Sequence, residues 1–200
     1  MHIQPPLPLD YAIPPAARPK RPLSLIGIGA ATVLAAMLFG ASTNAVNGEV
    51  SETYFTSVMG WQDHVWAQSI VQGILEGFVL GLLFAAVSTA AIGIITCGSC
   101  DLGTGLRWLR GILLAVYALW TLGGISGVAL AAAQPHFFRI SFIGVPGGRG
   151  EMFRFAWVGG SIWGAYGGGL LAIVVGLILF PRSWRRRLEL DSPSTGGAVQ

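Results

Sequence analysis

One acidic residue, Glu76, lies inside a long apolar stretch and is the side chain in this sequence best suited to chemistry. The stretch runs from Trp66 to Cys97 and contains no other charged residue. A carboxyl inside a membrane helix is unfavourable by about 3 kcal/mol on insertion scales, so such a group is a functional hypothesis by default. We expect Glu76 either to exchange a proton or bind a cation, or to act structurally. The structural alternatives are an interfacial carboxylate and a hydrogen-bond link between helices, with Gln72, a hydroxyl or a Trp indole as partner.

Two cysteines follow the same stretch, at Cys97 and Cys100. Two cysteines at this spacing could form half of a zinc site or a redox pair. Tetrahedral zinc needs two more ligands, however, and thioredoxin-like chemistry needs a βαβ context. The histidines are scattered and none lies in an apolar stretch. We therefore expect no enzyme, no resident metal and no cofactor, and leave open only a zinc site shared across a dimer.

Small residues recur four apart in two of the apolar stretches, which is the spacing of one helix face. Such a stripe lets the backbone of a second helix approach closely within a membrane. We expect these glycines to serve helix packing; they are Gly73, Gly77 and Gly81 in one stretch, and Gly160, Gly164 and Gly168 in the other.

The composition indicates which structural elements carry these residues. Of the 200 residues, 53% are hydrophobic and only 10% are charged, against roughly 25% charged in a soluble domain. A bilayer core about 30 Å thick needs about 20 apolar residues in a helix, because lipid offers the backbone no hydrogen-bond partner. The sequence therefore predicts an all-α membrane protein with four transmembrane helices, at about 23–46, 66–96, 109–133 and 155–180.

The segments between these helices are short. The turn after the second helix, around residues 97–105, predicts that the second and third helices are antiparallel neighbours. In the predicted loop 47–65, aromatic residues share one helical face, which favours a segment lying flat at the interface. The other loop is 134–154. The Pro-rich tail 1–22 is expected to be disordered, and Pro181 is expected to end the fourth helix ahead of a basic, then disordered tail, 181–200.

Basic residues set the orientation. Nine of the twelve Lys and Arg residues fall before the first helix, between the second and third, or after the fourth. By the positive-inside rule, both termini are cytoplasmic. The absence of a eukaryotic sorting signal and the short loops favour a bacterial inner membrane. A signal peptide in place of the first helix is the alternative, although its apolar run is long for one.

The two halves of the chain resemble each other. An ungapped offset of 88 residues places Gly73 over Ser161 and lays the first helix over the third. This predicts two helical hairpins related as a parallel 2+2 repeat, with the glycine-rich second and fourth helices meeting at the centre.

The sequence assigns no specific activity. We expect a non-enzymatic scaffold or interaction protein, with the lipid bilayer and either a second copy or another membrane protein as partners. Anionic lipid could bind at Arg185, Arg186 and Arg187, and nothing points to nucleic acid. The alternative is a small proton- or cation-coupled translocator that uses Glu76, and a third hypothesis is a redox or metal protein resting on Cys97 and Cys100.

Overall fold

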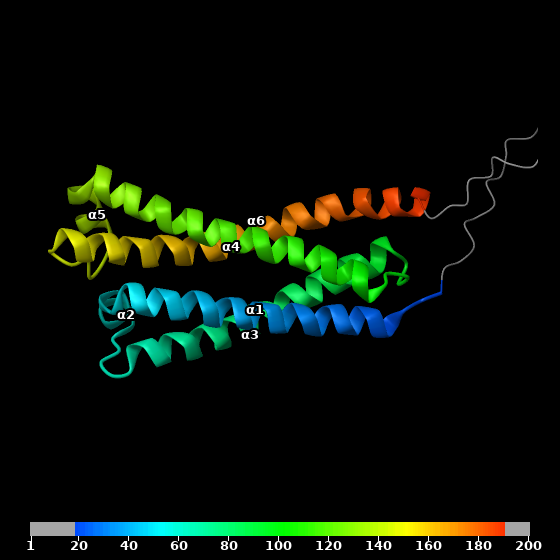
Figure 1. The fold of residues 1–200 in the computed structure, drawn as a ribbon, viewed down its shortest axis with the longest axis horizontal. Helices are drawn as coiled ribbons and strands as arrows, with labels where there is room; N and C mark the ends of the chain where they lie inside the picture. Colours follow the sequence, from blue (N-terminus) through cyan, green and yellow to red (C-terminus); the bar gives the residue numbers. More distant parts are fainter. Residues whose placement is uncertain (1–18, 191–200) are drawn as a thin grey trace, which may run out of the picture.

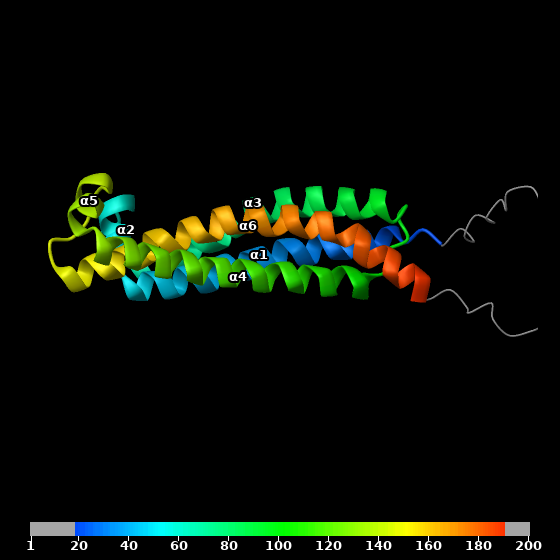
Figure 2. The same cartoon turned by 90° about the horizontal axis from the view of Figure 1, so that it is seen from above.

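The structure is a computed structural model that describes residues 19–190 and is entirely helical there. The predicted disorder of residues 1–18 and 191–200 lies outside the described residues. Four helices are long and apolar enough to cross a bilayer, which indicates a multi-pass membrane protein. They are α1 (Pro22–Val50), α3 (Val65–Ile95), α4 (Leu102–Ala133) and α6 (Arg149–Leu190); the short helices α2 (Glu52–Met59) and α5 (Pro135–Ser141) lie together at one end of the bundle (Figures 1 and 2).

The long helices pack as two pairs, α1 with α3 and α4 with α6, so the chain forms two hairpins (Figure 1). In the first hairpin the backbones of α1 and α3 touch where glycines face each other. A Cβ atom on Gly73 would overlap the backbone of Gly40, and one on Gly77 would overlap the backbone at Ala36. The hydroxyl of Ser69 also donates a hydrogen bond to the carbonyl of Asn44, at 3.0 Å.

The second hairpin is built in the same way. A Cβ atom on Gly160 would overlap the carbonyl oxygen of Gly123, and one on Gly164 would overlap that of Leu119. Toward the other end, the indole of Trp108 donates to the carbonyl of Gly176, at 3.3 Å. The glycine-lined faces therefore lie inside each hairpin.

Two expectations about neighbouring helices are wrong. The second and fourth helices do not meet through their glycines, because those faces of α3 and α6 are already covered by α1 and α4. Nor are α3 and α4 packed neighbours within residues 19–190. The start of α1 takes that place: Ile28 lies against Gly105 at the start of α4, and the backbone N–H of Arg21 donates to the carbonyl of Gly98 in the turn. We call this end of the bundle, where α1 begins and α6 ends, the inner end, and the opposite end the outer end (Figure 1).

The expectation that Pro181 ends the last helix is also wrong, because α6 continues through it to Leu190. A proline removes one backbone donor and kinks a helix rather than always ending it. Here the residues on either side are held by packing: Phe180 and Trp184 are buried in a cluster with Ile28 and Ile92 of the first hairpin. This cluster joins the two hairpins at their inner ends.

The opposite end carries the two short helices. Ser51 caps α2 by accepting a hydrogen bond from the backbone N–H of Tyr54, and Gly60 ends it in a left-handed conformation, with φ of 73°. The aromatic helical face expected in loop 47–65 is therefore interrupted at Gly60. Phe55 is buried and stacks on Trp61, with ring centroids 5.4 Å apart, so this segment folds down onto the helix ends.

The glycine contacts predict a stability difference between neighbouring positions on α6. Gly164→Ala should lower the thermal midpoint in detergent, because the added methyl meets the backbone of α4 and overpacking destabilises by about 1–3 kcal/mol. Gly167→Ala is the matched control, since nothing lies within 4 Å of its Cβ position. Size-exclusion chromatography after a heating series measures both variants. Equal midpoints would show that α4 and α6 do not depend on this contact.

Candidate functional site

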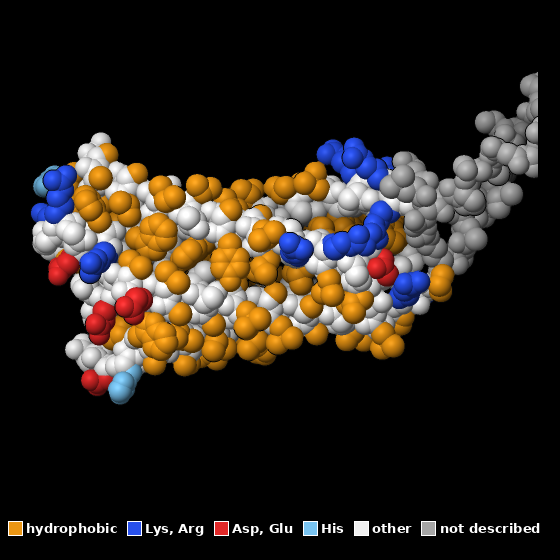
Figure 3. Space-filling view, viewed as in Figure 1, with side chains coloured by type: hydrophobic (Ala, Val, Ile, Leu, Met, Phe, Trp, Pro, Cys, Tyr) orange, Lys and Arg blue, Asp and Glu red, His pale blue; other side chains and the backbone are white. Residues whose placement is uncertain are grey.

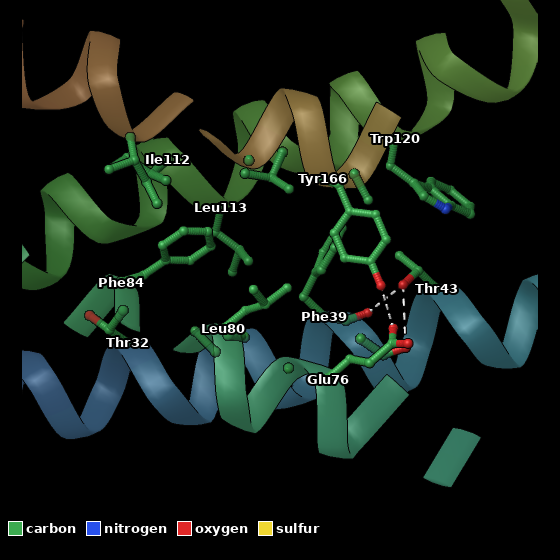
Figure 4. A pocket seen from close by; sticks show the side chains of 18 of the residues that line it. Thr32, Phe39, Thr43, Glu76, Leu80, Phe84, Ile112, Leu113, Trp120 and Tyr166 are labelled. Carbon is green, nitrogen blue, oxygen red and sulfur yellow. Dashed lines mark hydrogen bonds between the residues drawn. The ribbon is translucent and has the colours of Figure 1, made fainter. Parts of the chain in front are cut away.

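A cavity of about 370 Å³ lies between the two hairpins and is lined by all four long helices. Large side chains from both hairpins surround it, among them Phe39, Phe84, Leu113 and Trp120 (Figure 4). Leu83 and Leu170 also line it and are 57% and 60% exposed. The cavity therefore opens sideways, toward the medium that surrounds the bundle.

The packing of the hairpins explains where the cavity lies. Glycines draw the helices together within each hairpin, while bulky residues point at the other hairpin and hold it away. The hairpins meet at their inner ends through the Phe180 and Trp184 cluster. Toward their outer ends they meet through hydrogen bonds from Ser161 to Asn47 and between Ser42 and Tyr117. The space between these contacts is the cavity.

Glu76 of α3 lies on the wall of this cavity and is half-buried. The amide nitrogen of Gln72 donates to its Oε1 at 2.6 Å, and the hydroxyl of Tyr166, from α6, donates to its Oε2 at 2.7 Å (Figure 4). The expectation that Gln72 and a hydroxyl would hold this carboxyl is confirmed. The second bond connects the two hairpins, which is the helix link that the sequence left as one alternative.

Polar groups gather on the outer side of Glu76. Asn47 is only 1% exposed; its Oδ1 accepts from the Ser161 hydroxyl at 3.0 Å, but its Nδ2 has no hydrogen-bond partner. The indole nitrogen of Trp120 is also buried without a partner. Leaving a buried donor unsatisfied is unfavourable by about 1–3 kcal/mol. Both residues line the cavity, although neither nitrogen has accessible surface there.

The sequence did not reveal these donors. Asn47 was expected to begin an external loop, whereas α1 continues to Val50 and carries Asn47 into the bundle. The available clue was Asn44 three residues earlier, since two amides at that spacing share a helix face. Trp120 lies near the middle of the expected third helix, and nothing in the sequence places it at a cavity.

The two cysteines are not brought together with other ligands. Cys97 is exposed in a left-handed turn conformation, with φ of 50°, while Cys100 is buried. Burial raises the pKa of the Cys100 thiol, and the nearby Asp101 carboxylate acts in the same direction. Among residues 19–190, no three His, Cys, Asp or Glu side chains are close enough to hold a metal. The redox or metal hypothesis thus still rests on two thiols alone.

The basic segment of α6 is only partly free. Arg187 donates to the Thr104 hydroxyl and lies 3.7 Å from the Asp101 carboxylate. The Thr104 hydroxyl donates in turn to Asp101, which lowers the pKa of this carboxyl, with a further contribution from Arg187. Arg185 and Arg186 are exposed. The anionic-lipid site expected at these three arginines therefore has two exposed members and one engaged in the inner turn.

No family model, curated protein or solved structure matches this chain. The cavity and the Glu76–Tyr166 hydrogen bond are therefore the observations on which a function can be built. Of the other candidate residues, the glycines lie at helix contacts, and the cysteines lie in the turn between α3 and α4, outside the cavity.

Proposed function

We propose that this protein is a non-enzymatic membrane protein that binds an apolar or amphipathic molecule of the bilayer between its two hairpins. The observation that carries the proposal is the cavity lined by α1, α3, α4 and α6. Its volume of about 370 Å³ falls in the range of about 300–1,000 Å³ found for small-molecule sites. Packed protein interiors contain few voids larger than a water molecule, so a space of this size calls for an occupant.

The proposal refines the interaction protein expected from the sequence. In the external segments Phe55 and Phe138 are buried against the helix ends, whereas Ile140 and Ile143 are 70% and 86% exposed, so partner docking there keeps some support. The cavity, by contrast, is accessible from the side through Leu83 and Leu170. A molecule already dissolved in the bilayer would reach it without crossing water.

Filling the cavity tests this function. Ala165 of α6 lines the cavity, and Ala165→Phe should displace an occupant by taking up its space. Ala118→Phe is the matched control, because Ala118 is exposed on α4 and lies outside the cavity lining. Native mass spectrometry of protein released from mild detergent should show a bound molecule in the unmodified chain and in Ala118→Phe, and its loss in Ala165→Phe. An unmodified chain without an occupant, or equal occupancy in all three, would contradict the proposal.

A proton- or cation-coupled translocator is the second candidate. It is favoured by the position of Glu76 on the cavity wall and by its hydrogen bond to Tyr166 of the other hairpin. Separation of the hairpins would break that bond and release the carboxyl for exchange.

The translocator makes its own prediction in proteoliposomes that hold an imposed pH gradient. The unmodified chain should dissipate the gradient, and Glu76→Gln, which removes the exchangeable proton, should hold it like empty liposomes. Glu49→Gln, at an exposed position of α1 outside the cavity, is the control and should leak like the unmodified chain. If all three preparations retain the pH gradient equally, proton conduction through Glu76 is excluded.

We also propose that both termini face the cytoplasm of a bacterial cell. The support is the distribution of charge: the described residues before α1, the first turns of α4 and the end of α6 carry most of the basic side chains of the described residues and lie at one end (Figures 1 and 3). The short helices α2 and α5 would then face outward.

This orientation can be tested at Cys97, which is exposed in the inner turn, whereas Cys100 is buried. A membrane-impermeant maleimide should label Cys97 in inverted inner-membrane vesicles and leave it unlabelled in intact spheroplasts, because the turn would be cytoplasmic. A Cys97→Ser variant controls for reaction at other sites. Labelling in intact spheroplasts would reverse the topology.

The 2+2 repeat remains a proposal, with support from the packing contacts. The Gly40–Gly73 contact is echoed by Gly127 and Gly160, each 87 residues later, and Gly77 is echoed by Gly164 at the same offset. The offset of 88 from the sequence alone differs by one residue. The carbonyls that Gly73 and Gly77 approach, those of Gly40 and Ala36, correspond to those of Gly123 and Leu119 at an offset of 83. The contacts therefore show two hairpins built alike and do not fix a single offset.

A further inference from the structure

We propose that the cavity binds an amphipathic organic cation, with its positive head beside Glu76 and its apolar body deeper between the hairpins. This inference rests on the proposed function, because it specifies the chemical class of the molecule that occupies the cavity. Three features of the lining carry it: the charge of Glu76, the aromatic rings around it, and the change from polar to apolar residues along the cavity.

The charge argument starts from the residues that line the cavity. Glu76 is their only Asp or Glu, and they include no Lys, Arg or His. Gln72 and Tyr166 each donate one hydrogen bond to a different carboxylate oxygen, so each oxygen keeps a lone pair for another donor. A partly desolvated carboxylate is stabilised by a positive partner, and the lining supplies none. A cationic ligand supplies the missing charge.

Aromatic rings near Glu76 favour an organic cation over a metal ion. Tyr166, Phe39 and Trp120 lie on the same side of the cavity as the carboxyl (Figure 4). The face of an aromatic ring attracts an ammonium group, and this contribution grows when the pair is desolvated. Metal ions instead need several oxygen or nitrogen ligands, and no such cluster occurs among residues 19–190.

Two buried donors belong to residues on the polar side of the cavity. Asn47 is 1% exposed and lines the cavity, yet its Nδ2 has no partner, and the same holds for the indole nitrogen of Trp120. Neither nitrogen has accessible surface in the cavity, so both mark the polar character of this side without contacting an occupant. Neutral hydrocarbon would leave Glu76 without a positive partner.

The rest of the cavity matches an apolar body. Away from Glu76 the wall consists mainly of Leu80, Phe84, Ile112 and Leu113, as Figure 4 shows. The side opening at Leu83 and Leu170 is also apolar. A cation with a hydrophobic body can pass this opening from the bilayer, whereas a small hydrated cation would have to lose its water there.

A pair of probes with nearly the same shape and opposite charge tests the inference. Tetraphenylphosphonium and tetraphenylborate are dialysed separately against the purified full chain in a non-ionic detergent, with empty micelles subtracted. The chain should bind the phosphonium ion and bind the borate ion at least about tenfold more weakly, because only the cation complements Glu76. This comparison uses the unmodified protein and does not depend on the folding of a variant.

Variants then locate the site. Glu76→Gln should weaken phosphonium binding at least about tenfold, while Glu49→Gln, the exposed carboxylate of α1, should leave it unchanged. Ala165→Phe should reduce it by filling the cavity. Each variant must elute from size-exclusion chromatography like the unmodified chain, which checks that it is folded.

The possible failures are distinguishable. Equal binding of both ions, or full phosphonium binding by a well-folded Glu76→Gln, would overturn the cation inference and leave a cavity selective only for apolar molecules. If neither probe binds but native mass spectrometry shows a neutral occupant, the cation inference fails and the proposed function stands. If no occupant is found by either method, the inference and the proposed function fail together.

Discussion

Close backbone contact at glycines is the interaction on which the rest of this structure depends. In a bilayer the lipid tails are as apolar as leucine, so helices associate through packing and hydrogen bonds rather than through the hydrophobic effect. Gly40 against Gly73, and Gly123 against Gly160, bring the helices of each hairpin into such contact. Because the small residues are used within the hairpins, the faces that remain for contact between hairpins carry large side chains. The two hairpins consequently meet at their ends and leave a cavity between these contacts, which the Glu76–Tyr166 hydrogen bond bridges.

Glu76 gives this middle space its chemical character. A carboxyl in a membrane protein needs hydrogen-bond donors or a positive charge, and here Gln72 and Tyr166 supply two donors. The donor from α6 makes the carboxyl a link across the cavity as well as part of its wall. A site between two hairpins that each pack mainly internally can change its width without breaking those internal contacts, since fewer contacts join the hairpins to each other. Binding between the hairpins and transport between them are thus related possibilities of the same architecture.

The inner end shows how local rules were overridden by packing. Proline usually interrupts a helix because it lacks a backbone donor, yet Pro181 lies within α6. The burial of Phe180 and Trp184 against the first hairpin holds the helix on both sides of it. Beyond this point Arg187 reaches Thr104 and Asp101, so the basic segment contributes to the joint between the hairpins. Neither contact is visible in the sequence, because the partners are more than 80 residues away along the chain.

The sequence by itself determined that the protein is helical and membrane-spanning, because long apolar runs in lipid have few structures that satisfy the backbone. It also identified Glu76 and its neighbour Gln72, since residues four apart on a helix are necessarily close. Which helices pair was decided only by the tertiary structure: a glycine stripe shows that a helix can be approached closely and does not show by which partner. The cavity, the Tyr166 contact and the free donors of Asn47 and Trp120 depend on that pairing. They follow from how two hairpins fit together in space, which no periodicity along one chain can encode.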